Sequence, residues 1–536
     1  MQWNFADTWD AVAAAVPDRA AVVHGERRVS WAEFERRSAA LAAALLDAGL
    51  GRQAKVGTYL YSRPEYLETY YAAFKASLVP FNVNYRYKAD EVLYIFDNAD
   101  AEAVVFGASF TPLLEEIRDR LPAVRLWICV PEAGHDVPSW ATSYDDVASS
   151  GRRPEQAVER GGDDIFFLYT GGTTGMPKAV MWRQDDVAQL MGGGGNAFLG
   201  ETPAESLDEV RERVRGREVP QVHVPACPLM HGTGLFTCYQ TFLLGGTVAL
   251  LTSTSFKAQE LLDVTQRERA TSWAIVGDPF ARPVLEALDA QPGHWDISSL
   301  LVVGSSGAMW SEPIKRGLLK HHPGMILVDA FSSSEAVSMG ASISTGGDAA
   351  QTAKFTANPR TRVLRPDGTP VEPGSGEVGV VAVDSFLPLG YYKDPEKTGR
   401  TIVQYGDKRY VLSGDMATVD AEGQINVLGR GSVCINTGGE KVFPEEVEEV
   451  LKEVPGVRDA LCIGVPDQRW GEAVTAVVEA EGDVDPAEVI AHVKSRLADY
   501  KAPKHVLLGP VGRSPSGKAD YAATKKWAVD QLSTSS

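Results

Sequence analysis

The sequence predicts an α/β protein built from a large N-terminal domain and a small C-terminal domain. Its 536 residues exceed the length of one ordinary domain. Short apolar runs alternate with amphipathic segments over most of the chain, which is typical of buried sheet strands between helices. From about 362 to 428 the runs are interrupted by Gly, Pro and Asp, and the pattern changes again after Arg430. We therefore expect an N-terminal domain over residues 1–430, made of α/β subdomains plus a β subdomain, and an α+β C-terminal domain over residues 431–536.

The first helix signal is a capping box. Ser30 is a candidate N-cap, and Glu33 stands three residues later at the start of an Ala/Leu-rich helix that runs to Leu50. A second helix is expected at 66–76. Apolar runs predict buried strands at 56–60, 103–106, 165–169, 273–276, 300–303 and 325–328.

Three later segments have patterns of their own. Residues 192–195 are four glycines, and the charged stretch 205–218 follows them, which predicts a surface excursion with an exposed helix. The region from 362 to 428 predicts short strands. After it, Pro444 and Pro486 begin helices, and strands are expected at 460–465 and 473–480.

Composition and charge exclude several classes of protein. The net charge of −19 and the pI near 5.0 argue against a general nucleic-acid binder. The five cysteines are widely spaced and form no C-x-x-C pair, which favours reduced thiols over disulfides or a zinc site. No signal peptide is expected, and the apolar stretch 242–251 is far shorter than the ~20 residues of a membrane span. These patterns predict a cytoplasmic protein without a transmembrane segment, and they leave peripheral membrane contact open.

A predicted strand at 164–169 leads into a Gly- and Thr-rich loop at 170–178. Glycines allow backbone amides to point at phosphate oxygens, threonine hydroxyls add donors, and Lys178 adds positive charge. The loop is not a Walker A motif, because Met176 breaks the required spacing. A plain turn that ends in a surface lysine has the same composition, so the loop alone does not establish nucleotide binding.

The loop and further motifs, in the same order along the chain, resemble the adenylate-forming superfamily of acyl-CoA synthetases, peptide-synthetase adenylation domains and luciferases. The loop departs from the usual T-S-G-[ST]-T-G-x-P-K-G pattern at Gly171 and Ala179. The resemblance implies that ATP and AMP are bound by this loop, by a segment beside adenine and by three later motifs. The implied residues are Thr170, Gly171, Gly172, Thr173, Thr174, Gly175, Lys178, Ser306, Gly307, Ala308, Phe331, Ser332, Ser333, Asp415 and Arg430.

The segment 331–335 resembles the family motif Y-G-x-T-E. By that resemblance Phe331 stacks on adenine, Ser334 hydrogen-bonds the α-phosphate or the acyl carboxylate, and Glu335 holds Mg²⁺. A carboxylate suits this metal, which prefers hard oxygen ligands. The structural alternative is a serine-rich turn with Glu335 as a helix cap. Asp415 would accept hydrogen bonds from both ribose hydroxyls, and Arg430 would contact ribose or phosphate.

The acyl pocket is expected around Pro228–Gly232, which resembles the family's gate motif with His231 as the gate; outside that context His231 would more often be a core or loop histidine. The pocket candidates are His231, Gly232, Thr233, Gly234, Gly277, Asp278, Pro279 and Gly304.

The small domain carries the remaining motifs. Gly438, Gly439 and Glu440 resemble the loop that lines the pantetheine tunnel for coenzyme A, and Lys518 resembles the adenylation lysine. The resemblance implies a mobile domain that pivots near Gly431 and Ser432, although the family usually has Asp or Lys at the position of Ser432. The domain would bring Lys518 to the site for adenylation and then present the 438–443 loop for thioester formation. The stretch 512–518 also imitates a Walker A loop, but residue 519 is Ala and supplies no Mg²⁺ ligand.

The implied function is ATP-dependent activation of a carboxylic acid to acyl-AMP, followed by thioesterification to coenzyme A with release of AMP and pyrophosphate. Lys518, Glu335 and Ser334 would be catalytic. The segments 429–436 and 181–183 resemble actinobacterial acyl-CoA ligases, including sterol side-chain ligases, which favours a medium- or long-chain fatty acid or a sterol side-chain acid. Alternatives are a ligase that loads a separate carrier protein, a regulatory nucleotide binder and a luciferase-like oxygenase. A fused carrier domain is not expected after Lys518, and a homodimer stays open.

Overall fold

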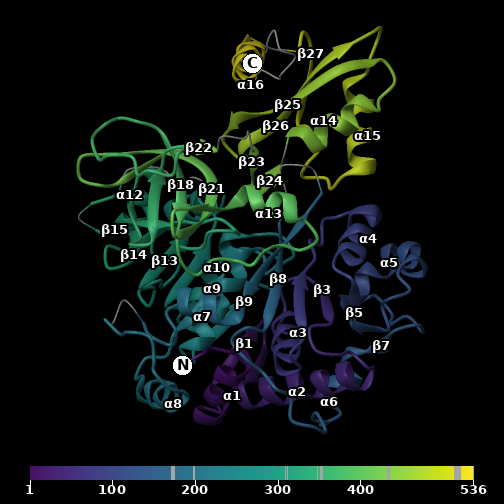
Figure 1. Ribbon diagram of the computed structural model, residues 1–536, viewed down its shortest axis with the longest axis vertical. Coiled ribbons are helices and arrows are strands. Elements are labelled where there is room, and N and C mark those ends of the chain that lie inside the picture. Colours follow the sequence, from purple (N-terminus) through teal and green to yellow (C-terminus); the bar gives the residue numbers. More distant parts are fainter. Residues whose placement is uncertain are drawn as a thin grey trace.

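The computed structural model describes residues 1–170, 176–196, 200–307, 310, 312–346, 348–350, 354–430, 435–442, 444–511 and 521–534. Within these residues the chain forms a large N-terminal domain with two sheets and a small C-terminal domain with a third. The small domain stands at one end of the long axis, and the N-terminus lies toward the other end (Figure 1). The predicted α/β fold class with a large and a small domain is confirmed.

The first sheet has a parallel centre and an antiparallel extension. Strands β1, β11, β10, β12, β13 and β14 run parallel, and β2 and β15 close this part with antiparallel pairs. In sheet order the strands are β17 (Thr361–Leu364), β18 (Gly379–Val383), β21 (Lys408–Val419), β22 (Ile425–Arg430), β16 (Lys354–Ala357), β15 (Gly340–Ser344), β14 (Ile326–Phe331), β13 (Val302–Ser305), β12 (Ser272–Ile275), β10 (Val222–Pro225), β11 (Thr247–Leu250), β1 (Ala20–His24) and β2 (Arg27–Ser30), while β20 (Ile402–Tyr405) pairs with β21.

The predicted β region is confirmed as strands, but they do not form an independent sheet. Strand β16 pairs with β15 on one side and with β22 on the other, so the antiparallel strands continue the large sheet.

The second sheet is parallel except at one edge. Its order is β19 (Gly390–Tyr391), β9 (Lys178–Arg183), β8 (Ile165–Thr170), β4 (Val79–Asn82), β3 (Lys55–Tyr59), β5 (Ala101–Gly107), β6 (Leu126–Val130) and β7 (Thr142–Ser143). Strands β8 and β9 form an antiparallel hairpin in which Thr170 is the backbone partner of Lys178. The loop between these two residues is the one that the sequence singles out for phosphate binding.

Helices pack between and around the two sheets. They are α1 (Phe5–Ala15), α2 (Trp31–Asp47), α3 (Pro64–Lys75), α4 (Ala89–Asn98), α5 (Thr111–Ile117), α6 (Tyr144–Ser149), α7 (Gln184–Leu190), α8 (Leu207–Gly216), α9 (Gly232–Leu243), α10 (Ala258–Glu268), α11 (Asp278–Ala290), α12 (Glu312–His321) and α13 (Pro395–Thr401), with short 3-10 turns at Ala108–Phe110 and Arg118–Arg120. Trp9, Phe74, Tyr239 and Phe242 form an aromatic core where α1, α3 and α9 meet. This packing fixes α9, which later forms one wall of the site.

Of two local predictions, the N-cap at Ser30 is confirmed and the exposed helix after the four glycines is confirmed only in part. The Ser30 hydroxyl accepts a hydrogen bond from the Glu33 amide at 3.1 Å, so the predicted N-cap is confirmed. The prediction of an exposed helix after the four glycines is only partly right. Helix α8 forms there, but Val210 and Val214 on one of its faces are buried and join the main core.

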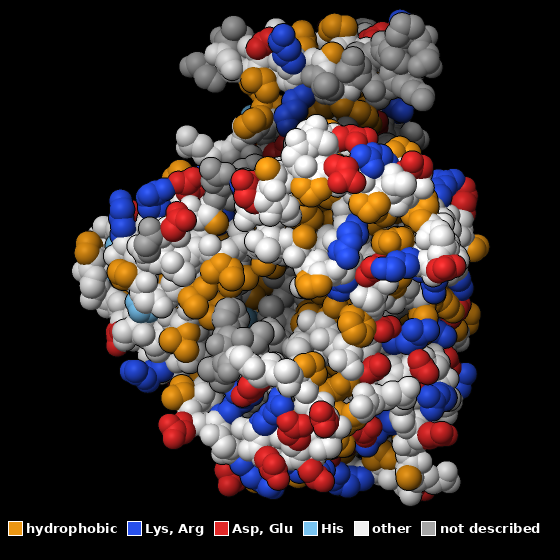
Figure 2. Space-filling model, turned by 60° about the vertical axis from the view of Figure 1, so that its left-hand side comes forward, with side chains coloured by type: hydrophobic (Ala, Val, Ile, Leu, Met, Phe, Trp, Pro, Cys, Tyr) orange, Lys and Arg blue, Asp and Glu red, His pale blue; other side chains and the backbone are white. Residues whose placement is uncertain are grey.

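The C-terminal domain is a separate packing unit. Its sheet has the order β24 (Glu440–Val442), β23 (Ile435–Thr437), β26 (Gly471–Ala480) and β25 (Val457–Asp467), with β27 (His505–Leu508) paired to β26. Helices α14 (Pro444–Lys452), α15 (Pro486–Arg496) and α16 (Tyr521–Thr534) cover it. Figure 2 shows this domain as a lobe above the large domain, with acidic and basic side chains mixed over the face in view.

The described part of the chain bears on the expectations about membrane spans and cysteines. None of its helices is long and apolar enough to cross a membrane. Cys129, Cys227, Cys238 and Cys462 are buried and form no disulfide among the described residues, and no metal-binding cluster of His, Cys, Asp and Glu occurs there.

Candidate active site

A cavity of about 440 Å³ lies where parallel strands of both large sheets end. Residues Asn82 and Thr170 end β4 and β8 of the second sheet, and Ser306 and Ser332 follow β13 and β14 of the first sheet. Ligands commonly bind at the carboxyl ends of parallel strands, because the loops that begin there converge. The fold therefore brings segments far apart in the sequence into one concave site.

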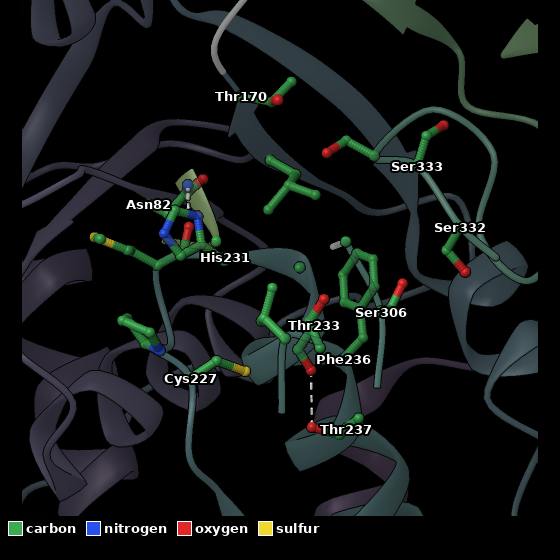
Figure 3. Close-up of a pocket in the computed structure, with 18 of the residues that line it drawn as sticks. Asn82, Thr170, Cys227, His231, Thr233, Phe236, Thr237, Ser306, Ser332 and Ser333 are labelled. Carbon is green, nitrogen blue, oxygen red and sulfur yellow. Dashed lines mark hydrogen bonds between the residues drawn. The ribbon is translucent and has the colours of Figure 1, made fainter. Parts of the chain in front are cut away.

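Many of the predicted site residues line this cavity. They are Thr170, Ser306, Gly307, Ser332, Ser333 and Ser334 from the predicted nucleotide motifs, His231, Gly232, Thr233 and Gly304 from the predicted acyl pocket, and Gly438, Gly439 and Glu440 from the predicted tunnel. Figure 3 shows Thr170 at one end of the cavity and Thr237 at the other, with Thr233 and Phe236 between them.

Asn82 connects the phosphate-loop strand to the His231 segment. Its side-chain NH₂ donates to the carbonyls of Tyr169, at 2.9 Å, and Met230, at 2.7 Å. Its carbonyl oxygen accepts from the Tyr169 amide at 2.7 Å. Asn82 is buried, so these bonds satisfy groups that water cannot reach. The arrangement fixes Thr170 and His231 relative to each other.

Glu440 reaches from the C-terminal domain into the cavity. Its Oε1 lies 2.9 Å from Arg86 Nη1 and 3.2 Å from His231 Nε2, and both partners belong to the large domain. Burial opposes ionisation of this carboxyl, but the charges of His231, Arg86 and Lys501, together with the hydrogen bond from His231, hold its pKa below the usual value. Because the ionised form is favoured, Glu440 makes an ion pair with Arg86 and a hydrogen bond with His231, both of them between the domains at the cavity.

A second buried ion pair supports the same domain orientation. Lys501 Nζ of the small domain lies 2.8 Å from Glu91 Oε1 of the large domain, and both side chains are almost fully buried. Tyr500 lines the cavity next to it and accepts a hydrogen bond from Asn84 at 3.4 Å.

The serine segment after β14 offers donors to a ligand. The Ser332 hydroxyl oxygen accepts from the Ser338 amide at 2.9 Å, and the Ser333 hydroxyl oxygen accepts from the Ala336 amide at 3.0 Å. A hydroxyl that accepts in this way keeps its own proton for donation. Trp182 Nε1 donates to the Ser334 carbonyl at 3.0 Å and anchors the segment to β9.

Glu335 follows this segment, and the Tyr391 hydroxyl donates to its Oε1 at 2.6 Å. The bond orients the carboxylate. An oriented carboxylate next to the serine hydroxyls fits Mg²⁺, which is usually held by one or two carboxylates, substrate phosphates and water. Among the residues that the structure describes, no cluster of His, Cys, Asp and Glu would supply several protein ligands to a metal.

Other predicted nucleotide residues lie outside the cavity lining. Lys178 forms an ion pair with Asp394, which caps α13. Phe331 stacks on Phe355 with ring centroids 5.2 Å apart. Asp415 is buried on β21 and is the backbone partner of Arg430 on β22, so the residue assigned to ribose and the residue assigned to ribose or phosphate are neighbours. Their proposed contacts with ATP stay predictions.

Gly277 is also absent from the lining among the described residues, and it precedes α11 as its N-cap with a φ of +56°. Its amide donates to the Ser305 hydroxyl at 2.9 Å, while the adjacent Val276 lines the cavity. The prediction that Gly277 borders the acid stays untested. Gly171, Gly172, Thr173, Thr174, Gly175, Ala308, Gly431, Ser432 and Lys518 lie outside the described residues.

The sequence reasoning missed two groups of side chains. The first is the cavity-facing side of α9, which includes Phe236, Thr237 and Gln240. The second is a cationic and aromatic cluster on the small domain, where the Arg469 guanidinium lies 4.7 Å and the Lys504 ammonium 5.2 Å from the Trp470 ring centroid. Trp470 also packs beside Gly438. The adjacent Arg469 and Trp470 are the signal that could have indicated the second group.

The chain matches the model of AMP-binding enzymes over residues 9–392 and that of their C-terminal domain over residues 446–518. It is 39% identical to the 3-oxocholest-4-en-26-oate–CoA ligase of Rhodococcus rhodochrous, a match that covers 99% of this chain and 96% of that protein. It is 38% identical to the medium-chain acyl-CoA ligase Mig of Mycobacterium avium, over 97% and 96% of the two chains. Among solved structures, the amide bond synthetase McbA from Marinactinospora thermotolerans shares the fold with a TM-score of 0.79 at 23% identity, over 97% of this chain and 99% of that chain. The chain belongs to the family of AMP-binding enzymes.

Proposed function

We propose that this protein is an AMP-forming acyl-CoA ligase that makes acyl-AMP from a carboxylic acid and ATP and then transfers the acyl group to coenzyme A. The observation that carries the proposal is that residues of both domains line the same cavity. Thr170 and the serine segment at 332–334 face it from the large domain, and Gly438–Glu440 face it from the small domain. A site that must handle first a nucleotide and then a thiol needs access from both domains.

The adenylation step joins two anions, so it depends on positive charge and hydrogen-bond donors around the α-phosphate. Thr170 and the hydroxyls of Ser333 and Ser334 stand at the cavity surface, where they can donate to phosphate or carboxylate oxygens. Mg²⁺ held by Glu335 would neutralise phosphate charge when it is bound. Lys518 would supply the mobile positive charge for this step. The stabilisation is electrostatic; the hydroxyls are already in position, whereas Lys518 would be brought in by the small domain.

The thioester step needs a narrow passage for the pantetheine arm. Gly438 and Gly439 have φ values of +59° and +84°, conformations that residues with a side chain rarely adopt. A Cβ on Gly438 would lie 3.0 Å from the Trp470 ring, and one on Gly439 would lie 3.2 Å from Val276. Glycine at both positions keeps the backbone close to its neighbours and leaves room beside it for a thin ligand.

The cluster at Trp470 favours coenzyme A over a carrier protein as the acyl acceptor. Burial and the nearby cation Lys494 lower the pKa of Lys504, Asp499 opposes this shift, and Arg469 adds to it, so Lys504 has two cations as neighbours. An adenine ring could stack on Trp470, and phosphates would relieve the repulsion between the cations. A carrier-bound pantetheine has no adenine and would not need this cluster. Loading of a separate carrier protein is therefore the second candidate.

The acid is expected to be a medium- or long-chain fatty acid or a sterol side-chain acid. The names of the two relatives suggest the medium-chain and the sterol acids. We place the boundary between the domains after Arg430, with Gly431 and Ser432 as the hinge. Rotation about this hinge would exchange the Gly438–Glu440 loop for Lys518 at the cavity.

The proposal is tested by measuring the two half-reactions, acyl-AMP formation and thioester formation, separately in the full-length protein. Lys518→Ala should abolish acyl-AMP formation from ATP while largely sparing thioester formation from supplied acyl-AMP. Equal loss of both half-reactions would contradict the assigned roles. Offering acyl-AMP to coenzyme A and to phosphopantetheinylated carrier proteins in parallel decides between the two acceptors.

A further inference from the structure

The inner face of α9 is a row of cavity-lining residues with polar groups at its far end. Gly232, Thr233, Phe236, Thr237 and Gln240 line the cavity, and their spacing places them on one side of the helix. The opposite side, with Leu235, Tyr239 and Phe242, is buried in the main core. Packing therefore fixes which side chains of α9 a bound acid can meet.

Gln240 is the most distal of these residues. In the described part of the chain, its side-chain amide makes no hydrogen bond to another residue, although the amide can donate twice and accept twice. The Thr237 hydroxyl, one turn earlier, donates its proton to the Thr233 carbonyl at 2.8 Å, so it can offer a ligand only its oxygen. The far end of the cavity thus offers both donors and acceptors.

The walls around this polar end are apolar. Leu190, Met191, Phe236, Val302, Val328 and Val337 line the cavity. They suit the hydrocarbon body of an acid. A plain alkyl end beside Gln240 would leave the amide dry and unpaired, which costs binding free energy.

We propose that the preferred acid carries a hydroxyl or oxo group remote from its carboxyl, and that Gln240 recognises this group. The inference rests on the proposed function and narrows its substrate class. At ~1.5 Å per residue, Gln240 lies roughly 13 Å beyond His231 along the axis of α9. We take the carboxyl carbon to lie level with His231 and the acid to extend along α9. Carbon–carbon bonds of ~1.5 Å advance an extended chain by about 1.3 Å each, so the polar group would stand about ten bonds from the carboxyl carbon.

The test compares 10-hydroxydecanoate with undecanoate, which has a methyl group in place of the hydroxyl. For the full-length enzyme we expect kcat/KM for acyl-AMP formation to be about tenfold higher with the hydroxy acid. A shorter pair, 8-hydroxyoctanoate and nonanoate, should show a smaller preference, because its hydroxyl stops short of Gln240. Gln240→Met keeps the length of the side chain and should remove the preference in the longer pair. Gln404→Met, at an exposed glutamine on β20, is the matched control and should keep it.

Each outcome supports or overturns the inference. Equal kcat/KM for the two long acids in the wild type, or an unchanged preference in Gln240→Met, would overturn it. A preference of the same size in the short pair would also overturn it, since hydroxyl position would then not matter. Turnover of undecanoate and 10-hydroxydecanoate at equal kcat/KM would refute only this inference. Lack of turnover with every acid would instead refute the proposed ligase function.

Discussion

Replacing Glu440 by Gln tests the contact between the domains. The change keeps the size of the side chain but removes the charge that meets Arg86 at 2.9 Å and His231 at 3.2 Å. Breaking a fully buried ion pair costs about 3–5 kcal/mol, because one charge stays buried without a partner. Here the Glu440 side chain is 6% exposed, but Arg86 and His231 are 37% and 34% exposed and can be hydrated in the variant. We therefore expect the smaller cost of about 1.5–3 kcal/mol that is typical of a hydrogen bond to a charged group.

This cost applies only to the domain orientation that brings Glu440 into the cavity. Thioester formation from supplied acyl-AMP should fall about 10- to 100-fold in Glu440→Gln, whereas acyl-AMP formation, measured by pyrophosphate exchange, should be unchanged. The assay measures thioester formation in a single turnover by quenched flow.

Glu453→Gln is a matched control for this variant. Glu453 also lies between a histidine and an arginine, with Oε2 3.3 Å from His492 and 3.2 Å from Arg496, but all three belong to the small domain. This control should leave both half-reactions unchanged. Equal slowing of the two half-reactions by Glu440→Gln, or an unchanged thioester rate, would refute the reasoning.

Four further predictions follow from the described contacts. Glu335→Gln should slow acyl-AMP formation about 10²-fold and raise the Mg²⁺ concentration needed for half-maximal rate, as a Mg²⁺ titration would show; an unchanged Mg²⁺ requirement would place the metal elsewhere. Trp470→Ala should raise KM for coenzyme A by about tenfold without changing KM for ATP, because it removes a stacking surface; a matching rise in KM for ATP would contradict this assignment. Asn82→Leu leaves the Tyr169 and Met230 backbone groups unpaired and should lower the free energy of unfolding by about 2–4 kcal/mol, measured by denaturant titration; a loss below about 0.5 kcal/mol would contradict it. The pKa of Glu440 is held below its usual value, so its contact is present above the usual carboxyl range and is lost as pH falls through the lowered pKa. The thiolate of coenzyme A becomes scarcer as pH falls in both proteins, so the measurement is the ratio of the wild-type thioester rate to the Glu440→Gln rate at each pH. This ratio should fall toward one at acid pH, and a ratio that does not change with pH would contradict the prediction.

The sequence predicted the architecture well where one local pattern determines it. Apolar runs located the strands around the site, and the Ser30 N-cap formed as expected. Helix α8 was expected to be exposed because charge dominates its composition, yet Val210 and Val214 lie one turn apart and are buried. That i, i+4 spacing was the available signal. The continuation of the large sheet through β16 has no local signal, because strand partners are set by tertiary packing.

The site was predictable only in part. Motifs in a fixed order indicated Thr170, the serines at 332–334 and Gly438–Glu440, all of which line the cavity. The contact between Arg86 and Glu440 joins residues 354 positions apart, and neither residue alone indicates the other. Gln240 was missed for another reason. A glutamine near the end of an apolar helix has the same local pattern whether it faces solvent or a cavity, and only the packing of α9 decides which.

The central claim is that this protein activates carboxylic acids with ATP. Pyrophosphate exchange into ATP measures this most directly, with the full-length enzyme, Mg²⁺ and a panel of acetate, octanoate, palmitate, an aryl acid and a sterol side-chain acid. We predict exchange that requires one of these acids, with octanoate, palmitate or the sterol acid above acetate, and that proceeds without coenzyme A. Absence of exchange with every acid, or exchange that does not depend on an acid, would contradict the account.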